Sequence, residues 1–178
     1  PLIQNGEQIY DNVSGFLSTV DQLLDLSAGT LQDKGNTITV KGDMKNTAVH
    51  ESDANADTGV VFSGTVAQRV WSDVKGVFGN VGINNVKGVT FDDEFTINNR
   101  LKFTTGILNI DENLLRLGVN AEIQGASSSM HIMSNGIYRD KGVEKVFPKS
   151  AAAVSFVYPL GVAGGKYTPA IITLSNNS

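Results

Sequence analysis

The stretch LKFTTGILNIDENLLRLGVNAEI, residues 101–123, decides the fold, because its pattern occurs twice in the chain. Residues 24–44 read LDLSAGTLQDKGNTITVKGDM, and they align with residues 101–121 without a gap. The offset is 77 residues throughout (101 − 24 = 77 and 113 − 36 = 77). The alignment pairs identical residues at these positions: Leu24 with Leu101, Gly29 with Gly106, Leu31 with Leu108, and Asn36 with Asn113.

Apolar residues alternate with polar ones around both copies, and this is the signal of a half-buried β-strand. The predicted inward rows are Ile38 and Val40; Phe95, Ile97, Leu101 and Phe103; and Leu115, Leu117, Val119, Ala121 and Ile123. Gly, Asn and Asp separate the strands and favour turns. The best helical candidate is residues 12–26, but the repeat places its end on a strand, so we interpret it as strand.

Many short strands are typical of both β-solenoids and β-sandwiches. A gapless repeat favours the solenoid, because coils of roughly 20–45 residues bury their apolar faces against one another. We therefore predict an all-β parallel β-helix, with a β-sandwich as the alternative. We expect an entry segment with the first strands at 1–19, coils at 20–125, and a β-rich capping element at 126–178. Gly29 and Gly106 are predicted at sharp corners, and Asn36 and Asn113 beside turns.

Composition excludes several classes of protein. The net charge of −4 over 178 residues offers no electrostatic footprint for nucleic acid. The chain has no Cys, and no apolar run approaches the 18 residues that a membrane-spanning helix needs, so we expect no membrane insertion. It starts without Met or a signal peptide, and we expect it to be a piece of a longer chain.

A loop near residue 55 matches part of a calcium-binding pattern. Asp53, Asn55 and Asp57 have the 1, 3, 5 spacing of a calcium loop. However, Gly59 comes one place late, and Gly64 stands where the pattern requires Glu. We therefore expect a solvated loop with no bound metal. The two histidines, 50 and 131, bring too few ligands for a metal site.

No set of residues has the pattern of a catalytic or cofactor-binding site. Residues 92–94 (DDE) and 111–112 (DE) offer paired carboxylates, as glycoside hydrolysis requires, but they occupy polar turns that predict a solvated face. We expect no enzyme and no cofactor. Trp71 and three tyrosines (Tyr138, Tyr158 and Tyr167) fit either a sugar-stacking platform or packing at the ends of coils.

The order of several short motifs resembles the repeat tracts of large cell-surface proteins of Bacteroidetes, which are exported by the type IX secretion system. The motifs that carry the resemblance are VVFSGTVAQRVWS (60–72), FGNVGINN (78–85), GVTF (88–91), LKFTTGIL (101–108) and FVYPLG with KYTPAII (156–161 and 166–172). The last element departs from the family pattern, because Tyr158 and not Phe precedes Pro159.

The resemblance implies a secreted structural or adhesive segment on the bacterial cell surface, with a role in attachment or gliding motility. It also implies that components of the type IX secretion and outer-membrane carrier machinery are partners, through the parent protein. Surface glycans are further candidate partners. The alternatives are a carbohydrate-binding β module and a polysaccharide-degrading β-helix enzyme.

Overall fold

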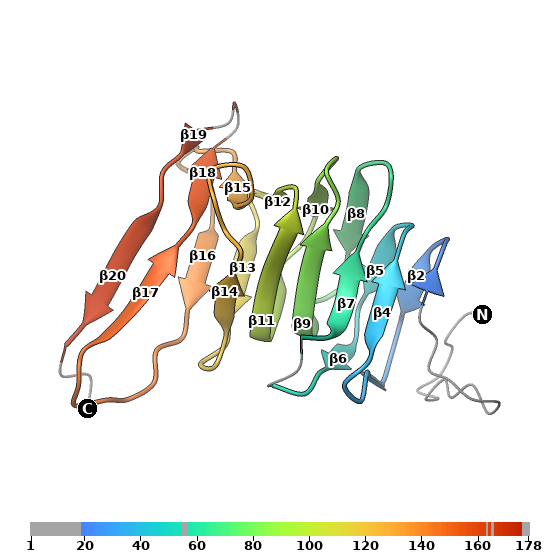
Figure 1. Cartoon of the computed structure of the whole chain (residues 1–178), viewed down its shortest axis with the longest axis horizontal. Coiled ribbons are helices and arrows are strands. Elements are labelled where there is room, and N and C mark those ends of the chain that lie inside the picture. The colour runs from blue at the N-terminus through green and yellow to red at the C-terminus, as the bar shows by residue number, and fades with distance from the viewer. Residues whose placement is uncertain (1–18, 55–56, 163, 165, 176–178) are drawn as a thin grey trace.

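The computed structural model describes residues 19–54, 57–162, 164 and 166–175, and this part of the chain contains strands and no helix. The strands wind into a β-solenoid of about five turns, whose coils follow one another along the long axis (Figure 1). This confirms the predicted parallel β-helix. The coils have up to three strand segments, separated by corners, so the solenoid has three walls of stacked parallel strands.

The walls are defined by which strands pair. The first wall consists of β2 (Leu24–Leu26), β5 (Met44–Asn46), β8 (Gln68–Trp71), β10 (Val89–Phe91), β12 (Leu108–Asp111), β15 (Ile132–Ser134) and β18 (Leu160–Val162). The second consists of β3 (Thr30–Gln32), β6 (Val49–Glu51), the first parts of β9 (Gly76–Asn84) and β11 (Phe95–Thr105), β13 (Leu114–Leu117) and β16 (Gly142–Lys145). The third consists of β1 (Thr19–Val20), β4 (Thr37–Val40), β7 (Gly59–Phe62), the second parts of β9 and β11, and β14 (Glu122–Gln124).

Apolar side chains form continuous columns inside each wall. On the third wall, backbone pairing sets Ile38, Val60, Val81 and Leu101 one above the other, and all four are buried. The walls meet at an aromatic cluster that consists of Phe62, Phe78, Phe91 and Phe95. Adjacent ring centroids in this cluster lie 4.7 to 6.4 Å apart. These columns are the core, because burying each large side chain contributes about 1.5–3 kcal/mol.

The predicted inward rows are buried, except that Ile123 is half-buried and Val119 is exposed. Leu115 and Leu117 are 1 % and 0 % exposed, whereas Val119 is 45 % exposed. The prediction for Val119 was wrong because the row crosses a corner. The amide of Gly118 donates to Ile97 and that of Ala121 donates back to Gly118, so the chain turns between β13 and β14 and the alternation restarts.

The two copies of the repeat occupy different walls. Leu24 lies on the first wall, whereas Leu101 lies on the third, in the column that contains Ile38. The 77-residue offset therefore is not a whole number of coils. Coils also differ in length, with 20 residues from Leu24 to Met44 (44 − 24) and 26 from Met44 to Val70 (70 − 44). All three walls share one alternation and similar corners, so a segment of one wall resembles a segment of another.

The predicted corner glycines have the backbone conformation that only glycine adopts readily. The φ angles of Gly29 and Gly106 are 82° and 88°. A Cβ atom on Gly106 would also overlap the carbonyl oxygen of Asn85 in the preceding coil. Asn36 donates its side-chain amide to the carbonyl oxygen of Asp33, 2.9 Å away, and lies beside the turn at residues 34–35, as predicted.

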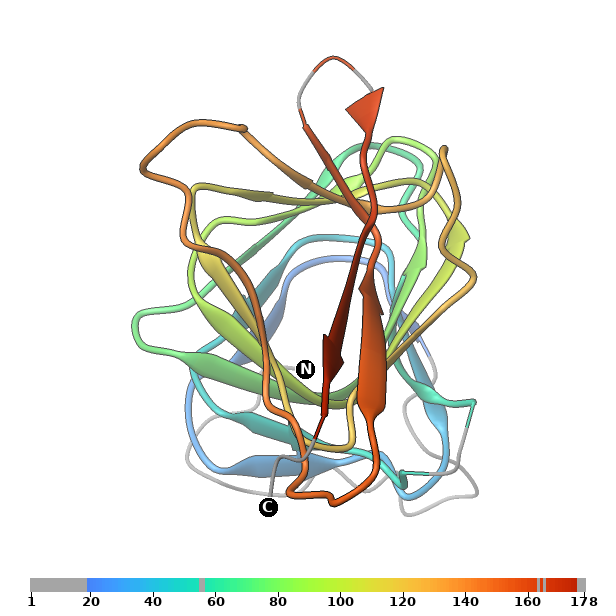
Figure 2. The same cartoon turned by 90° about the vertical axis from the view of Figure 1, so that its left-hand side faces the viewer.

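Parallel pairing continues past residue 125, through β15, β16 and β18. Antiparallel strands then follow: β17 (Val154–Tyr158) pairs with β20 (Ala170–Leu174), and β19 (Lys166–Tyr167) pairs with β18. Figure 2 shows β17 and β20 running across the mouth of the coils. Phe156 of β17 contacts Tyr158 and Phe147, with ring centroids 4.9 and 6.5 Å apart. The entry segment predicted at 1–19 lies outside the described residues except for Thr19.

Leu117 and Val119 provide a test of the inward row. Leu117→Ala should lower the free energy of unfolding by ~2–5 kcal/mol, because it empties a fully buried site. Val119→Ala is the matched control and should change it by less than about 0.5 kcal/mol. Urea unfolding followed by circular dichroism measures both variants. Equal losses would show that the row does not turn at this corner.

Two glycines with positive φ separate backbone strain from steric overlap. Gly142 has a φ of 71°, and no heavy atom lies within 4 Å of the place that a Cβ atom would occupy. Gly142→Ala should therefore cost ~1–2 kcal/mol from the left-handed backbone alone. Gly106→Ala should cost roughly 1–3 kcal/mol more, because the new methyl group meets the Asn85 carbonyl. The measurement is the urea midpoint of each variant, and similar midpoints would contradict the close approach of the coils.

Candidate functional site

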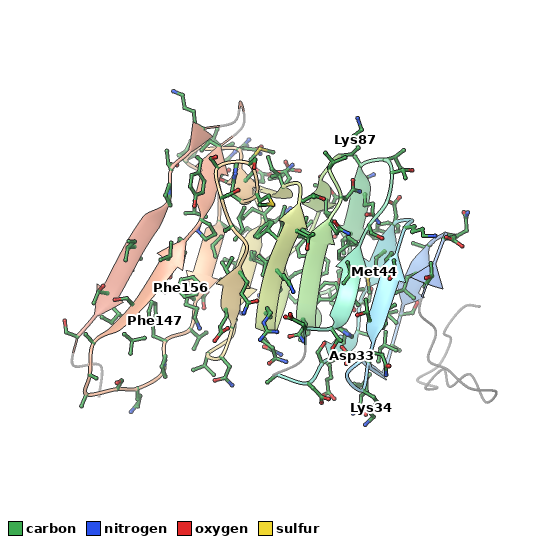
Figure 3. The ribbon with its side chains drawn as sticks, in the orientation of Figure 1. Asp33, Lys34, Met44, Lys87, Phe147 and Phe156 are labelled. Atoms are coloured by element: carbon green, nitrogen blue, oxygen red, sulfur yellow. The ribbon has the colours of Figure 1, made fainter. Side chains whose placement is uncertain are left out.

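A buried polar cluster lies at the corner after the second-wall strands of the first two coils. His50 and Asp33 are fully buried, and His50 Nε2 lies 3.2 Å from Asp33 Oδ2. The hydroxyl of Ser52 lies 3.4 Å from the same Nε2 atom and accepts a hydrogen bond from the amide of Asn80 at 3.0 Å. Figure 3 labels Asp33 and Lys34 at this edge of the solenoid. Sequence reasoning missed this cluster, since its members are 17 and 28 residues apart.

These residue types also form catalytic triads, but the geometry here differs. In a triad the base uses one ring nitrogen toward the nucleophile and the other toward the carboxylate. Here both partners approach Nε2 of His50, away from solvent. Burial raises the pKa of Asp33, but hydrogen bonds from His50, Ser52 and the amide of Gly35 outweigh it and hold this pKa below the usual 3.8. The arrangement suits a structural role, in which buried hydrogen bonds hold neighbouring coils together.

The second histidine lies in a separate environment. His131 is 1 % exposed, directly before β15, and its ring contacts that of Tyr167 at 5.3 Å. The ring occupies the space where a side chain at Gly161 would lie. The two histidines therefore are not brought together. Among the described residues, no group of three His, Cys, Asp or Glu side chains is arranged to hold a metal ion.

The structure describes two of the three residues of the candidate calcium loop, and Asn55 lies outside the described residues. The carboxylate of Asp57 lies 2.9 Å from both Lys102 Nζ and Arg100 Nη1. Lys102, followed by Arg100, holds the pKa of Asp57 below its usual value of 3.8. Two cations at this carboxylate oppose the binding of a third, because like charges repel at this distance.

Chelation therefore should leave the melting temperature of the chain unchanged, because we expect no calcium ion to contribute to folding. Thermal unfolding with EDTA and with added calcium chloride measures this. A calcium-dependent rise of several degrees would contradict the expectation, provided that it disappears in the double variant Asp53→Ala, Asp57→Ala, since a bound ligand stabilises the folded state.

The acidic turns that offered paired carboxylates are occupied by partners within the fold. Glu94 lies 3.1 Å from Lys75 and 2.7 Å from Lys141, and Lys141 followed by Lys75 lowers its pKa. A general acid for glycoside cleavage needs the opposite shift. Asp92 pairs with Arg69 at 2.7 Å.

The other acids of these turns have partners too. Asp93 accepts a hydrogen bond from the amide of Ser72 at 2.9 Å, and Asp111 accepts one from the side-chain amide of Asn109 at 2.8 Å. Glu112 lies 3.7 Å from Arg139. These contacts fix the turns, and they leave the carboxylates paired with the protein itself.

The aromatic residues that the sequence offered as a sugar platform lie apart. Tyr158 is 6 % exposed and packs on Phe156, whereas Tyr138 is 95 % exposed. Trp71 points outward from the first wall, because its neighbour Val70 points inward. It lines a groove of about 370 Å³ with residues from three successive coils: Asp21, Gln22 and Leu23; Lys41, Gly42 and Asp43; and Val66, Ala67 and Gln68.

A second groove, of about 480 Å³, follows the same edge of the solenoid further along. Its walls include Val86, Lys87 and Ile107 from the corners and Met130 and Met133 from the following coil. Figure 3 labels Lys87 at this edge, opposite Asp33. Both grooves lie where the third wall turns into the first.

Comparisons of the chain with protein-family models, with curated proteins and with solved structures find no match. In the part of the chain that the structure describes, no helix is long and apolar enough to cross a membrane. What the fold and its surface define is a β-solenoid with polar outer walls and external grooves.

Proposed function

We propose that the chain is a structural and adhesive segment of a secreted bacterial cell-surface protein, without a catalytic role. The observation that supports it is the architecture itself, in which the parallel strands of each coil pair only with those of the coils before and after it. Such a body lengthens by adding coils, with no redesign of a core. It offers long outer walls on which many weak contacts add up to strong attachment.

The surface chemistry is consistent with this function. Ion pairs such as Lys41–Asp21, Arg69–Asp92 and Arg116–Glu144 join neighbouring coils on the outside, at 2.9, 2.7 and 3.1 Å. The walls between them carry Thr, Asn and Gln side chains. Hydrated, mixed-charge walls suit reversible contact with a polar surface, and the paired acidic turns favour this function over polysaccharide cleavage.

The resemblance to type IX secretion substrates supports a location on the outside of the cell, with export and anchoring supplied by other parts of the parent protein. The alternative function is that of a carbohydrate-binding module, and the groove at Trp71 favours it. The two functions agree in predicting that the segment makes contacts and carries no export signal.

A parent protein that lacks residues 20–175 and carries an epitope tag in their place should still be exported and anchored at the surface, but attachment or gliding should be reduced. Surface labelling of intact cells and an adhesion assay measure the two effects. A matched strain carrying Val119→Ala should behave as wild type, because this exposed side chain contributes little to folding. Retention of the shortened protein inside the cell would show that the segment is an export signal, and unchanged adhesion would show that it is only a spacer.

A further inference from the structure

The groove at Trp71 combines an aromatic surface with apolar and carboxylate groups on the outside of the molecule. Leu23 and Val66, which line it, are 46 % and 67 % exposed. The backbone pairs Trp71 with Lys45 in the preceding coil. An indole held on a rigid strand, with apolar side chains beside it, is a flat and fixed platform for a ligand.

Carboxylates project beside this platform. Asp43 accepts the amide hydrogen of Arg69 through Oδ1, at 2.8 Å, and no ion pair of the described residues involves it. Asp21 pairs with Lys41 at 2.9 Å, where both side chains are largely exposed, at 70 % and 51 %. A carboxylate oxygen accepts hydrogen bonds from hydroxyl groups, and a lysine ammonium donates them.

We propose that this groove is a binding subsite for a neutral hexopyranoside, in which the flat C–H face of the sugar ring stacks on Trp71. The ring hydroxyls then donate to Asp43 and Asp21 and accept from Lys41. One cation and two carboxylates give the groove a net charge of −1, which disfavours nucleotides and sulfated or uronic-acid glycans. The volume of about 370 Å³ lies in the range of small-molecule sites, and suits one or two sugar rings.

The subsite deepens the proposed adhesive function, on which it rests, by assigning a ligand class to the corner where the third wall turns into the first. A single shallow site of this kind binds weakly, with a Kd on the order of 1 mM. Many copies of the chain on one surface convert weak binding into attachment.

The chain supplies its own reporter, because Trp71 is its only tryptophan. Cellobiose and lactose are the probes, since each presents a pyranose ring with a flat C–H face. Saturable change in tryptophan emission with either disaccharide is the expected result, and Asp43→Asn should weaken it at least about threefold, the equivalent of losing one hydrogen bond. No change with either sugar up to about 20 mM, well above the expected Kd, would overturn the proposal.

Calorimetric titration extends the test to a variant without tryptophan. Trp71→Ala should weaken binding at least about tenfold, as for an aromatic residue at the centre of a binding site. Tyr138→Ala is the matched control, since this aromatic residue is 95 % exposed and lies outside the groove. Circular dichroism confirms that each variant is folded. Equal binding by Trp71→Ala and wild type would place any sugar elsewhere and overturn the subsite.

The outcomes for the two functions are distinguishable. Loss of attachment on deletion of residues 20–175, without sugar binding in either titration, would leave the adhesive function and remove the subsite. Sugar binding at Trp71 together with unchanged attachment of the deletion strain would do the reverse.

Discussion

Each coil of this protein is held by the coils on either side of it, through parallel backbone pairing in the walls and apolar columns inside them. Both interactions require that residues of neighbouring coils occupy matching positions along their strands, so that their side chains stack. Where that holds, as for Ile38, Val60, Val81 and Leu101, the side chains are buried. Where the backbone turns, as at Val119, the side chain leaves the core. The corners are therefore where the constraint is relaxed.

The corners also contain the buried polar groups, because turning the chain frees backbone groups that need partners. Gln68 shows the solution: its side chain donates to the carbonyl of Val40 at 3.0 Å and accepts from the amides of Gly64 and Asn85 at 2.8 and 2.9 Å. At another corner, Asp33 accepts the amide hydrogen of Gly35 at 2.9 Å and Ser52 accepts that of Asn80 at 3.0 Å. Buried polar side chains are thus part of the frame, and their burial by itself indicates no chemistry.

Since the frame uses the inward side chains and the corners, the outward side chains are free to differ from coil to coil. Most of the charged ones pair between coils, as Asp57 does with Arg100 and Lys102 and Glu94 does with Lys141. The Trp71 groove contains one such pair, Lys41 with Asp21, but it also leaves Leu23 and Val66 exposed beside Trp71. These exposed apolar side chains, together with Trp71, are the basis for the proposal that the groove binds another molecule.

By itself, the sequence determined the class of fold, the burial of most of the inward rows and the glycine corners, because a period of two and a positive φ are local properties. The walls share one local pattern, so only the tertiary structure decided that Leu24 and Leu101 lie on different walls. The tertiary structure alone also placed Asp57 next to Lys102, His50 next to Asp33, and Trp71 and Asp43 in one groove. The coils differ in length, and their lengths decide which residues of neighbouring coils lie side by side. A coil length can be read only from the pairing of strands in the folded chain.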